Sequence, residues 1–128
     1  MGDEQDVRAA VAGIIAAFGE ERMDDYFARF TPDCSFLFHT TARRMPSVQA
    51  YRDEYARWVA EDGFRIRSCE TTDTEVQLHG DVAVVTHHVV THVEVGGRPQ
   101  VLDERETIVL RKVDGRWMGV HEHLSESP

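Results

Sequence analysis

The sequence ERETIVLRK (residues 104–112), followed by VDGR (113–116) and WMGVHEHLS (117–125), has the pattern of a β-hairpin. Both flanking segments are rich in residues that favour strands. The Asp114-Gly115 pair between them is a strong hairpin signal, because glycine accepts a positive φ without steric cost. We therefore expect two antiparallel strands near the end of the chain.

The second strand of this hairpin carries a distinctive set of side chains on one face. Alternation along a strand places Trp117, Gly119, His121, His123 and Ser125 on the same side. The two imidazoles then lie about 7 Å apart, at a rise of ~3.4 Å per residue. A large aromatic beside two imidazoles suits the floor of a pocket better than an open surface, so we predict that this face is enclosed.

The pairing of the two strands depends on the turn that joins them. A two-residue turn sets Glu106 opposite His123. A bulge at Gly115 after a type I turn shifts the register by one residue and sets Arg105 opposite His123 instead. The turn residues alone leave both registers open.

Hydrophobic periodicity upstream of the hairpin predicts helix, helix, strand, helix and then, with the hairpin, four strands. Short turns make neighbouring strands antiparallel, and helices gathered on one side of such a sheet form an α+β layer. The expected helices span residues 6–20, 24–30 and the segment from an N-cap at Ser47 to a stop at Gly63; the earlier strands span 34–40, 64–78 with a bend, and 82–95.

Length and composition bound the class of protein. The 128 residues predict a single domain, residues 1–128, with a composition of 41% hydrophobic and 29% charged residues that is typical of a globular chain. A net charge of −9 argues against nucleic acid and anionic membranes as partners, because their phosphates would be repelled. An acidic N-terminus and the lack of an apolar run near ~20 residues predict a cytoplasmic protein. Cys34 and Cys69 are expected to be buried thiols.

The order of elements, together with DGRW (114–117), VHEHLS (120–125) and RET (105–107), resembles the SnoaL-like group of the nuclear transport factor 2 superfamily. The resemblance covers nearly the whole chain. It implies a cone-shaped domain in which a strongly curved mixed or antiparallel sheet wraps three helices, with a pocket between them. It also implies a homodimer through the outer sheet face. The superfamily includes polyketide cyclases, ketosteroid isomerases, dehydratases, epoxide hydrolases and non-enzymatic association domains, so the fold leaves the chemistry open.

The expected chemistry is acid–base catalysis by the imidazole pair. His121 and His123 are candidate catalytic residues, because one neutral imidazole accepts a proton while the other stabilises a developing oxyanion. The bulged register is favoured because the resembled family tends to place its Arg and Thr on the pocket side, which makes Arg105 a third catalytic candidate. His39 and His87 are expected to position the substrate oxygen. The alternatives are hydrogen-bonded structural histidines, and a surface ion pair for Arg105.

The expected ligand is a small hydrophobic or aromatic carbonyl compound. Aromatic side chains with polar tips supply flat pocket walls, although such a stripe at helical spacing is also typical of plain core. The expected wall residues are Tyr26, Tyr55, Trp58 and Trp117.

The favoured function is an isomerase, cyclase or dehydratase that uses no cofactor and no metal. The resembled family generally works without metal, and the sequence has no CxxC or HExxH motif. A site built from His121 and His123 with His39, His87 or Glu104 is the metal alternative. The other function that stays open is a non-catalytic ligand-binding or dimerisation module, because no catalytic aspartate stands in a recognisable motif.

Overall fold

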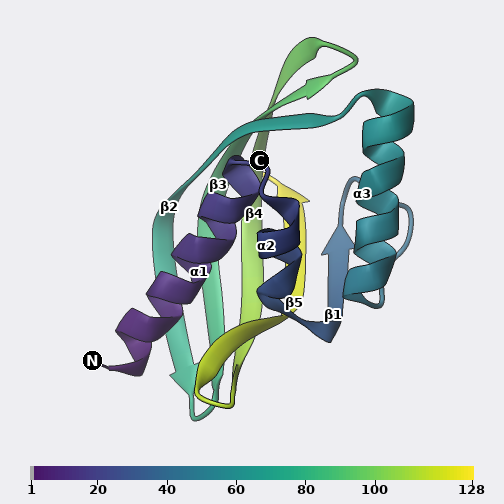
Figure 1. Cartoon of the computed structure of the whole chain (residues 1–128). Helices are drawn as coiled ribbons and strands as arrows, with labels where there is room; N and C mark the ends of the chain where they lie inside the picture. Colours follow the sequence, from purple (N-terminus) through teal and green to yellow (C-terminus); the bar gives the residue numbers. More distant parts are fainter. Residues whose placement is uncertain (1) are drawn as a thin grey trace.

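The computed structural model describes residues 2–128, and Met1, the first residue of the predicted domain, lies outside the described residues. The elements follow the predicted order of helix, helix, strand, helix and four strands (Figure 1). They are α1 (Asp3–Gly19), α2 (Met23–Ala28), β1 (Phe30–Phe38), α3 (Val48–Asp62), β2 (Arg65–His79), β3 (Val82–Val95), β4 (Arg98–Val113) and β5 (Arg116–Glu126).

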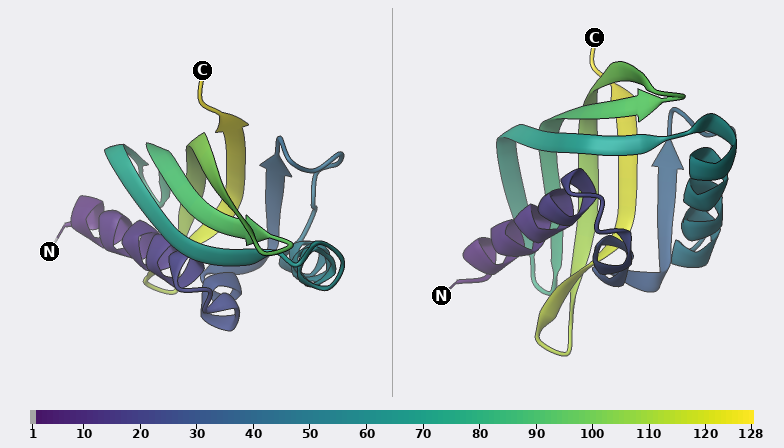
Figure 2. Two further views of the ribbon diagram at one scale, coloured as in Figure 1. Left: turned by 90° about the horizontal axis from the view of Figure 1, so that it is seen from above. Right: turned by 45° about the horizontal axis from the view of Figure 1, so that its top comes forward.

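The five strands form one mixed sheet in the order β1-β5-β4-β3-β2. β1 runs parallel to β5, and the other neighbours are antiparallel. The sheet is strongly curved, and the helices lie on its concave side (Figure 2). The predicted α+β fold, with a curved sheet wrapped around three helices, is confirmed.

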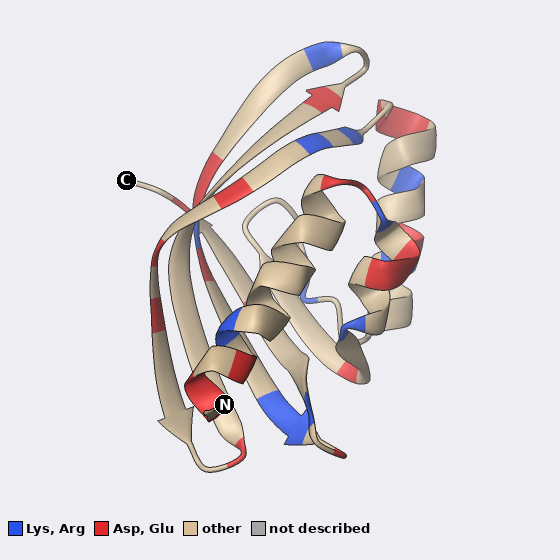
Figure 3. Ribbon diagram, turned by 60° about the vertical axis from the view of Figure 1, so that its left-hand side comes forward, with Lys and Arg blue, Asp and Glu red and all other residues tan. Residues whose placement is uncertain are grey.

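Each helix is explained by local sequence signals. Val7, Val11, Ile14 and Ala17 form the buried stripe of α1, whose charged residues are confined to its first turns (Figure 3). The hydroxyl of Ser47 accepts a hydrogen bond from the Ala50 backbone N–H at 3.1 Å and caps α3, as predicted. α3 ends at Gly63, whose φ of +62° satisfies the left-handed C-cap. None of the helices within residues 2–128 is both long and apolar enough to cross a membrane.

The first strand begins earlier than predicted. β1 starts at Phe30 and runs through Pro32, although proline removes a backbone N–H from the sheet. This is tolerated because β1 is the edge strand of the sheet. The pairing of β1 with β5 is also irregular between Phe30 and Ser35, so the proline lies where the ladder is interrupted.

The β4–β5 hairpin has a two-residue turn followed by a bulge within β5. Asp114 and Gly115 have φ values of +50° and +78°, which is the conformation of a tight hairpin turn. The register then shifts between the pairs Leu110↔Gly119 and Val109↔His121, and Val120 is the extra residue. The favoured bulge at Gly115 is wrong, and the two-residue turn is correct only up to Gly119.

The hydrophobic core fills the space between the helices and the concave face of the sheet. Its most deeply buried large side chains come from both layers: Phe36, Ile108, Leu110, Val7, Val85 and Cys34. Both cysteines are free thiols, with Cys34 buried and Cys69 half-buried. The core includes the aromatic side chains of α2 and α3, with Tyr26, Phe27 and Tyr51 buried and Tyr55 and Trp58 packed against them.

Candidate active site

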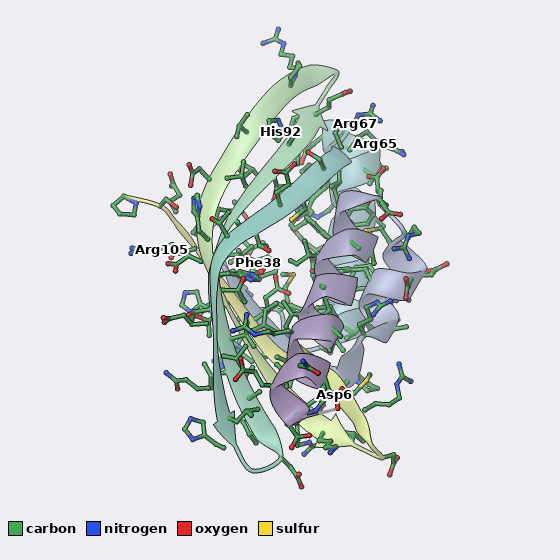
Figure 4. The ribbon with its side chains drawn as sticks, turned by 90° about the vertical axis from the view of Figure 1, so that its left-hand side faces the viewer. Asp6, Phe38, Arg65, Arg67, His92 and Arg105 are labelled. Atoms are coloured by element: carbon green, nitrogen blue, oxygen red, sulfur yellow. The ribbon has the colours of Figure 1, made fainter. Side chains whose placement is uncertain are left out.

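A cavity of about 270 Å³ lies between the helices and the concave face of the sheet. Phe38, labelled in Figure 4, points into this space between the sheet and α1. Asp62 and Gln100 are exposed and mark the open rim. The apolar walls are formed by Ile14, Ile15, Phe18, Phe38, Trp58, Phe64, Val89, Val93, Val95, Leu102 and Leu124.

The deep end of the cavity contains a continuous chain of hydrogen-bonded polar side chains, which we call the acid cluster: His87, Glu106, Glu122, Tyr26 and Tyr51. His87 Nε2 lies 2.6 Å from Glu106 Oε1, and Glu106 shares a hydrogen bond with Glu122. The Tyr26 hydroxyl donates to Glu122 Oε1 at 3.4 Å and lies 3.2 Å from the Tyr51 hydroxyl. All five residues are buried, and all except His87 line the cavity.

The sheet register brings the acid cluster together. His87 on β3 pairs directly with Glu106 on β4, so the two side chains share the concave face. Glu122 on β5 pairs with Ile108, two residues along β4 from Glu106, which places the two carboxyl groups diagonally across neighbouring strands. Tyr26 is supplied by α2 and closes the cluster from the helix layer.

Burial shifts the proton affinities of both carboxyl groups upward. Desolvation raises the pKa of Glu106 to about 7, although its hydrogen bond with Glu122 acts in the opposite direction. The pKa of Glu122 is raised well above its usual range, first by burial and then by the negative charge of Glu106. At neutral pH the pair therefore holds at least one proton, and Glu106 is the member poised to exchange it.

His87 is a neutral partner for Glu106. Burial lowers the pKa of His87 below its ordinary value, so the imidazole stays uncharged at neutral pH. Its Nδ1 is buried without a hydrogen-bond partner among the described residues. We assign the Nε2–H tautomer when Glu106 is ionised, because it leaves an acceptor lone pair unpaired rather than a buried N–H donor.

A third carboxyl group, Glu104, lies two residues before Glu106 on the same face of β4. Its Oε2 is 2.5 Å from His39 Nε2, and burial raises the pKa of Glu104 while the hydrogen bond from His39 lowers it. Glu104 lines the cavity, and His39 remains partly exposed at its edge. His39 therefore contacts Glu104 and does not itself line the cavity.

This arrangement supplies the groups that proton transfer requires. Glu106 can act as a base near neutral pH, because its pKa lies near the working pH. Glu122 in its neutral form and the hydroxyls of Tyr26 and Tyr51, whose pKa values burial raises well above 10, are hydrogen-bond donors for an oxyanion. The apolar walls exclude water and strengthen these interactions.

The predicted imidazole pair does not face this cavity. Because Val120 is an extra residue, the alternation of β5 reverses beyond Gly119, which turns Glu122 inward and both His121 and His123 outward. The prediction that the two histidines line the pocket is wrong for this reason. Arg105 is also on the outer face, where Figure 4 shows it on the side of the sheet away from the helices.

The outer face brings the displaced candidates near one another. Arg105 and His123 line a shallow groove of about 370 Å³, together with His88, Thr86, Thr107 and Ser125. His121 and His123 have ring centroids 6.4 Å apart, and His121 Nδ1 lies 2.8 Å from the Ser35 hydroxyl. Burial and the neighbouring His123 lower the pKa of His121. The groove lies on the face of the sheet opposite the cavity, and Glu106 contributes to the lining of both.

The predicted substrate-binding residues divide between the cavity and other places. Tyr26 and Trp58 line the cavity, and His87 reaches it through Glu106. Tyr55 is outside the cavity lining, where its hydroxyl donates to Glu21 Oε2 at 2.7 Å. Trp117 is buried in the core rather than at the cavity, so the prediction that it forms a pocket wall is wrong.

The sequence interpretation missed Glu106, Glu122 and Tyr51 as site residues and considered Glu104 only as a metal ligand. A usable signal was present, because Glu104 and Glu106 alternate with Ile108 and Leu110 along one face of β4. Glutamates on the apolar face of a strand indicate buried carboxyl groups with altered proton affinity. Glu122 had no such signal, because its orientation depends on the bulge.

The structure does not gather the side chains of a metal site. Within residues 2–128, no group of three or more His, Cys, Asp or Glu side chains is arranged to hold a metal ion. His121 and His123 point away from Glu104 and His87, so the alternative metal set is divided between the two faces of the sheet.

Comparison with known proteins relates this architecture to a family. A family model described as a SnoaL-like domain matches residues 7–128. A nuclear transport factor 2-like protein of unknown function in nutrient uptake from Rhodospirillum rubrum has a TM-score of 0.82 at 21% identity, over 96% of this chain and 99% of that chain. A protein of unknown function from Mycobacterium tuberculosis has a TM-score of 0.78 at 24% identity, over 98% and 72% of the two chains.

A further nuclear transport factor 2-like protein, from Cytophaga hutchinsonii, has a TM-score of 0.83 at 12% identity, over 99% of this chain and 100% of that chain. These identities establish a shared fold and carry no information about substrate. A search of proteins with curated functions finds no significant match.

Proposed function

The chain belongs to the family of SnoaL-like domains, and on that premise we propose that it is a cofactor-independent enzyme that transfers a proton on a small hydrophobic carbonyl compound. The observation that carries the proposal is the pair of buried glutamates, Glu106 and Glu122, at the deep end of an apolar cavity. A buried carboxyl pair of this kind is costly to fold and is typical of acid–base sites.

In the proposed reaction, Glu106 in its carboxylate form removes a proton from the carbon next to the carbonyl. The C–H electron pair moves into the new C=C bond, and the carbonyl π electrons move to oxygen to give an enolate. Glu122 in its acid form and the Tyr26 hydroxyl donate hydrogen bonds to that oxygen. In a β,γ-unsaturated carbonyl compound the enolate extends to a dienolate, and return of the proton from Glu106 to the γ carbon completes an isomerisation. In a β-hydroxy carbonyl compound the enolate electrons form the α,β double bond, and the hydroxyl takes the proton from Glu106 and leaves as water.

His87 is proposed as a positioning residue for the base. It contacts Glu106 rather than the cavity, so it fixes the orientation of the carboxylate and does not touch the substrate. In this proposal the acid–base groups are the carboxyl groups of β4 and β5, in place of the predicted imidazoles of β5.

A non-catalytic binding module is the second candidate function. The observation that favours it is that Glu104 and Glu106 each already contact an imidazole, at 2.5 and 2.6 Å. In a binding module these contacts would hold the carboxyl groups away from a ligand. An enzyme requires Glu106 to exchange its proton with a bound molecule.

Hydrogen–deuterium exchange of 2-tetralone separates the two functions. Its acidic protons next to the carbonyl exchange in D₂O at a rate that NMR measures directly. We expect the protein to accelerate this exchange, with a rate that rises through pH about 7 as Glu106 ionises. We expect Glu106→Gln to slow it by about 100-fold or more, the usual size of an acid–base contribution.

The matched control is Asp103→Asn, which alters an exposed carboxyl group on the other face of β4. This variant should exchange at the wild-type rate. Equal rates for wild type and Glu106→Gln would overturn the assignment of the base. Binding of 2-tetralone without any acceleration over buffer would support the binding module instead.

A further inference from the structure

We infer that the cavity selects its ligands by charge: a hydrophobic amine in its ammonium form binds more tightly than the alcohol of the same skeleton, and the corresponding carboxylate is rejected. This inference uses the cavity of the proposed function but does not depend on proton transfer. It rests on which charged and aromatic groups converge on the cavity.

The side chains lining the cavity that can carry a charge near neutral pH are all carboxylic acids. Four carboxyl groups contribute to the lining: Glu104, Glu106 and Glu122 at the deep end and Asp62 at the rim. No Lys or Arg side chain of residues 2–128 contributes to it. An anionic ligand would meet like charge and no cationic partner, and leaving a charge buried without a partner is strongly unfavourable.

The walls of the cavity add a second feature that favours cations. Aromatic rings from four different elements line it: Phe18, Tyr26, Phe38, Tyr51, Trp58 and the residue before β2, Phe64. Several of these rings pack edge to face, for example Tyr26 on Tyr51 with centroids 5.9 Å apart. The faces of such rings attract cations within about 6 Å of the centroid.

The position of the ammonium group follows from the acid cluster. Glu106 and Glu122 are diagonal neighbours on β4 and β5, and both line the cavity. Burial and their mutual repulsion favour a proton on at least one of the two carboxyl groups. An ammonium group carries three N–H donors and can take the place of that proton. Binding then adds one positive charge from the ligand while one proton leaves for the solvent, so the charge of the site is unchanged.

The other titratable groups around the cavity do not oppose this exchange. Glu104 is engaged by His39, and His87 is neutral because burial lowers its pKa. Burial raises the pKa of the Cys69 thiol to about 12, which keeps it neutral as well. The titratable groups that face the cluster are Tyr26 from α2, His39 from β1, Tyr51 and Asp62 from α3, Cys69 from β2, His87 from β3, Glu104 and Glu106 from β4, and Glu122 from β5.

Three naphthalene derivatives of one skeleton test the inference: 2-naphthylmethylamine, 2-naphthylmethanol and 2-naphthoate. Isothermal titration calorimetry at pH 7.5 is expected to rank the amine about tenfold tighter than the alcohol, and the carboxylate about 100-fold weaker than the alcohol. Titration of the amine in phosphate and in Tris, whose ionisation enthalpies differ, should show release of up to one proton. The alcohol should show none.

Glu122→Gln and Glu106→Gln test whether the carboxyl pair carries the preference. Each variant should lose most of the preference for the amine over the alcohol, whereas Asp103→Asn should keep it. Glu104→Gln provides a further variant if one of the others does not fold, as judged by circular dichroism, and it should reduce the preference for the amine.

Three outcomes would overturn the inference: equal affinity for amine and alcohol, tight binding of the carboxylate, or no binding of any of the three. A protein that prefers the amine but does not exchange 2-tetralone would retain this inference and lose the proposed enzymatic function. A protein that accelerates the exchange of 2-tetralone but binds the amine no more tightly than the alcohol would retain the proposed enzymatic function and lose the charge selection.

Discussion

At the scale of single residues, the acid cluster is a site where folding and proton binding are coupled. Glu106 and Glu122 are buried among aromatic and aliphatic side chains, and each retains its proton more strongly in the folded chain than in the unfolded chain. A carboxyl group whose pKa is raised by folding stabilises the folded state only while it is protonated. The contribution of these carboxyl groups to the free energy of unfolding is therefore expected to fall as the pH rises, whereas that of a salt-bridged carboxylate would rise.

The first prediction concerns this dependence. The pKa of Glu106 rises from 4.5 to about 7 on folding, so its contribution is fully present below pH 4.5 and is lost as pH rises through 7. Between pH 5 and pH 8 the free energy of unfolding of the wild type should fall by about 2–3 kcal/mol more than that of Glu106→Gln. Urea unfolding followed by circular dichroism at several pH values measures the difference.

The control for this experiment is Glu75→Gln, because Glu75 is an exposed carboxyl group on the outer face of β2. Its curve should follow the wild type. Parallel curves for wild type and Glu106→Gln would show that folding does not shift the proton affinity of this carboxyl group.

At the scale of elements, strand β5 determines which side chains reach the cavity. Its first half is inserted between β4 and the start of β1, where a Cβ on Gly119 would lie 2.4 Å from Phe30 Cδ1. The next residue, Val120, is the bulge. Gly119 therefore permits the close approach of Phe30 at the point where the strand changes face.

The second prediction is that Gly119→Ala destabilises the protein. The added methyl group overlaps the Phe30 ring, which is held by Tyr26 and Phe36 at centroid distances of 5.2 Å each. Overpacking of this kind should lower the free energy of unfolding by about 1–3 kcal/mol. Gly2→Ala is the control, because nothing lies within 4 Å of a Cβ at that position. Equal urea midpoints for the two variants would contradict the crowding at Gly119.

The same strand marks the boundary of what the sequence predicts. The order of all eight elements, the Ser47 cap and the Gly63 stop follow from periodicity and local signals, and the structure confirms them. The orientation of His121 does not follow, because a one-residue bulge has no signature in the alternation of β5. Every residue beyond it changes face, and the interpretation of the site changed with it.

The buried face of β4 follows from the alternation of its sequence. Glu104 and Glu106 lie on the same face of β4 as Ile108 and Leu110, because side chains alternate along a strand whatever their polarity. The burial of these glutamates was therefore accessible from the sequence. Their hydrogen bonds to His39 and His87 were not, because they depend on pairing between segments 65 and 19 residues apart.

At the scale of the whole molecule, the helices occupy the concave side of the sheet and leave its outer face uncovered within residues 2–128 (Figure 4). This face carries the apolar side chains Val101, with 58% of its surface exposed, and Leu37, with 39% exposed. Half-buried valines on β3 and β4 share this face at Val84, Val90 and Val109. We propose that a second copy of the chain covers this face, as the family resemblance implies.

The third prediction tests that homodimer. Light scattering coupled to size-exclusion chromatography should give twice the chain mass of 14.6 kDa. Val101→Glu should weaken the dimer by about 100-fold or more, because it places a charge in an apolar contact. Leu78→Glu is the control, because Leu78 is 40% exposed but shares the other side of the sheet with Ala83. A monomeric wild type at all concentrations would remove the proposal.

The extra residue at Val120 has a consequence for the choice of groups that face the interior. Deleting Val120 alone would remove the bulge and leave Glu122 inward, because the residues after it would keep their partners on β4. A strand of the same length that paired without the bulge would instead turn the two neighbouring imidazoles inward and Glu122 outward. One irregular pair in the sheet therefore decides which reactive groups the interior receives.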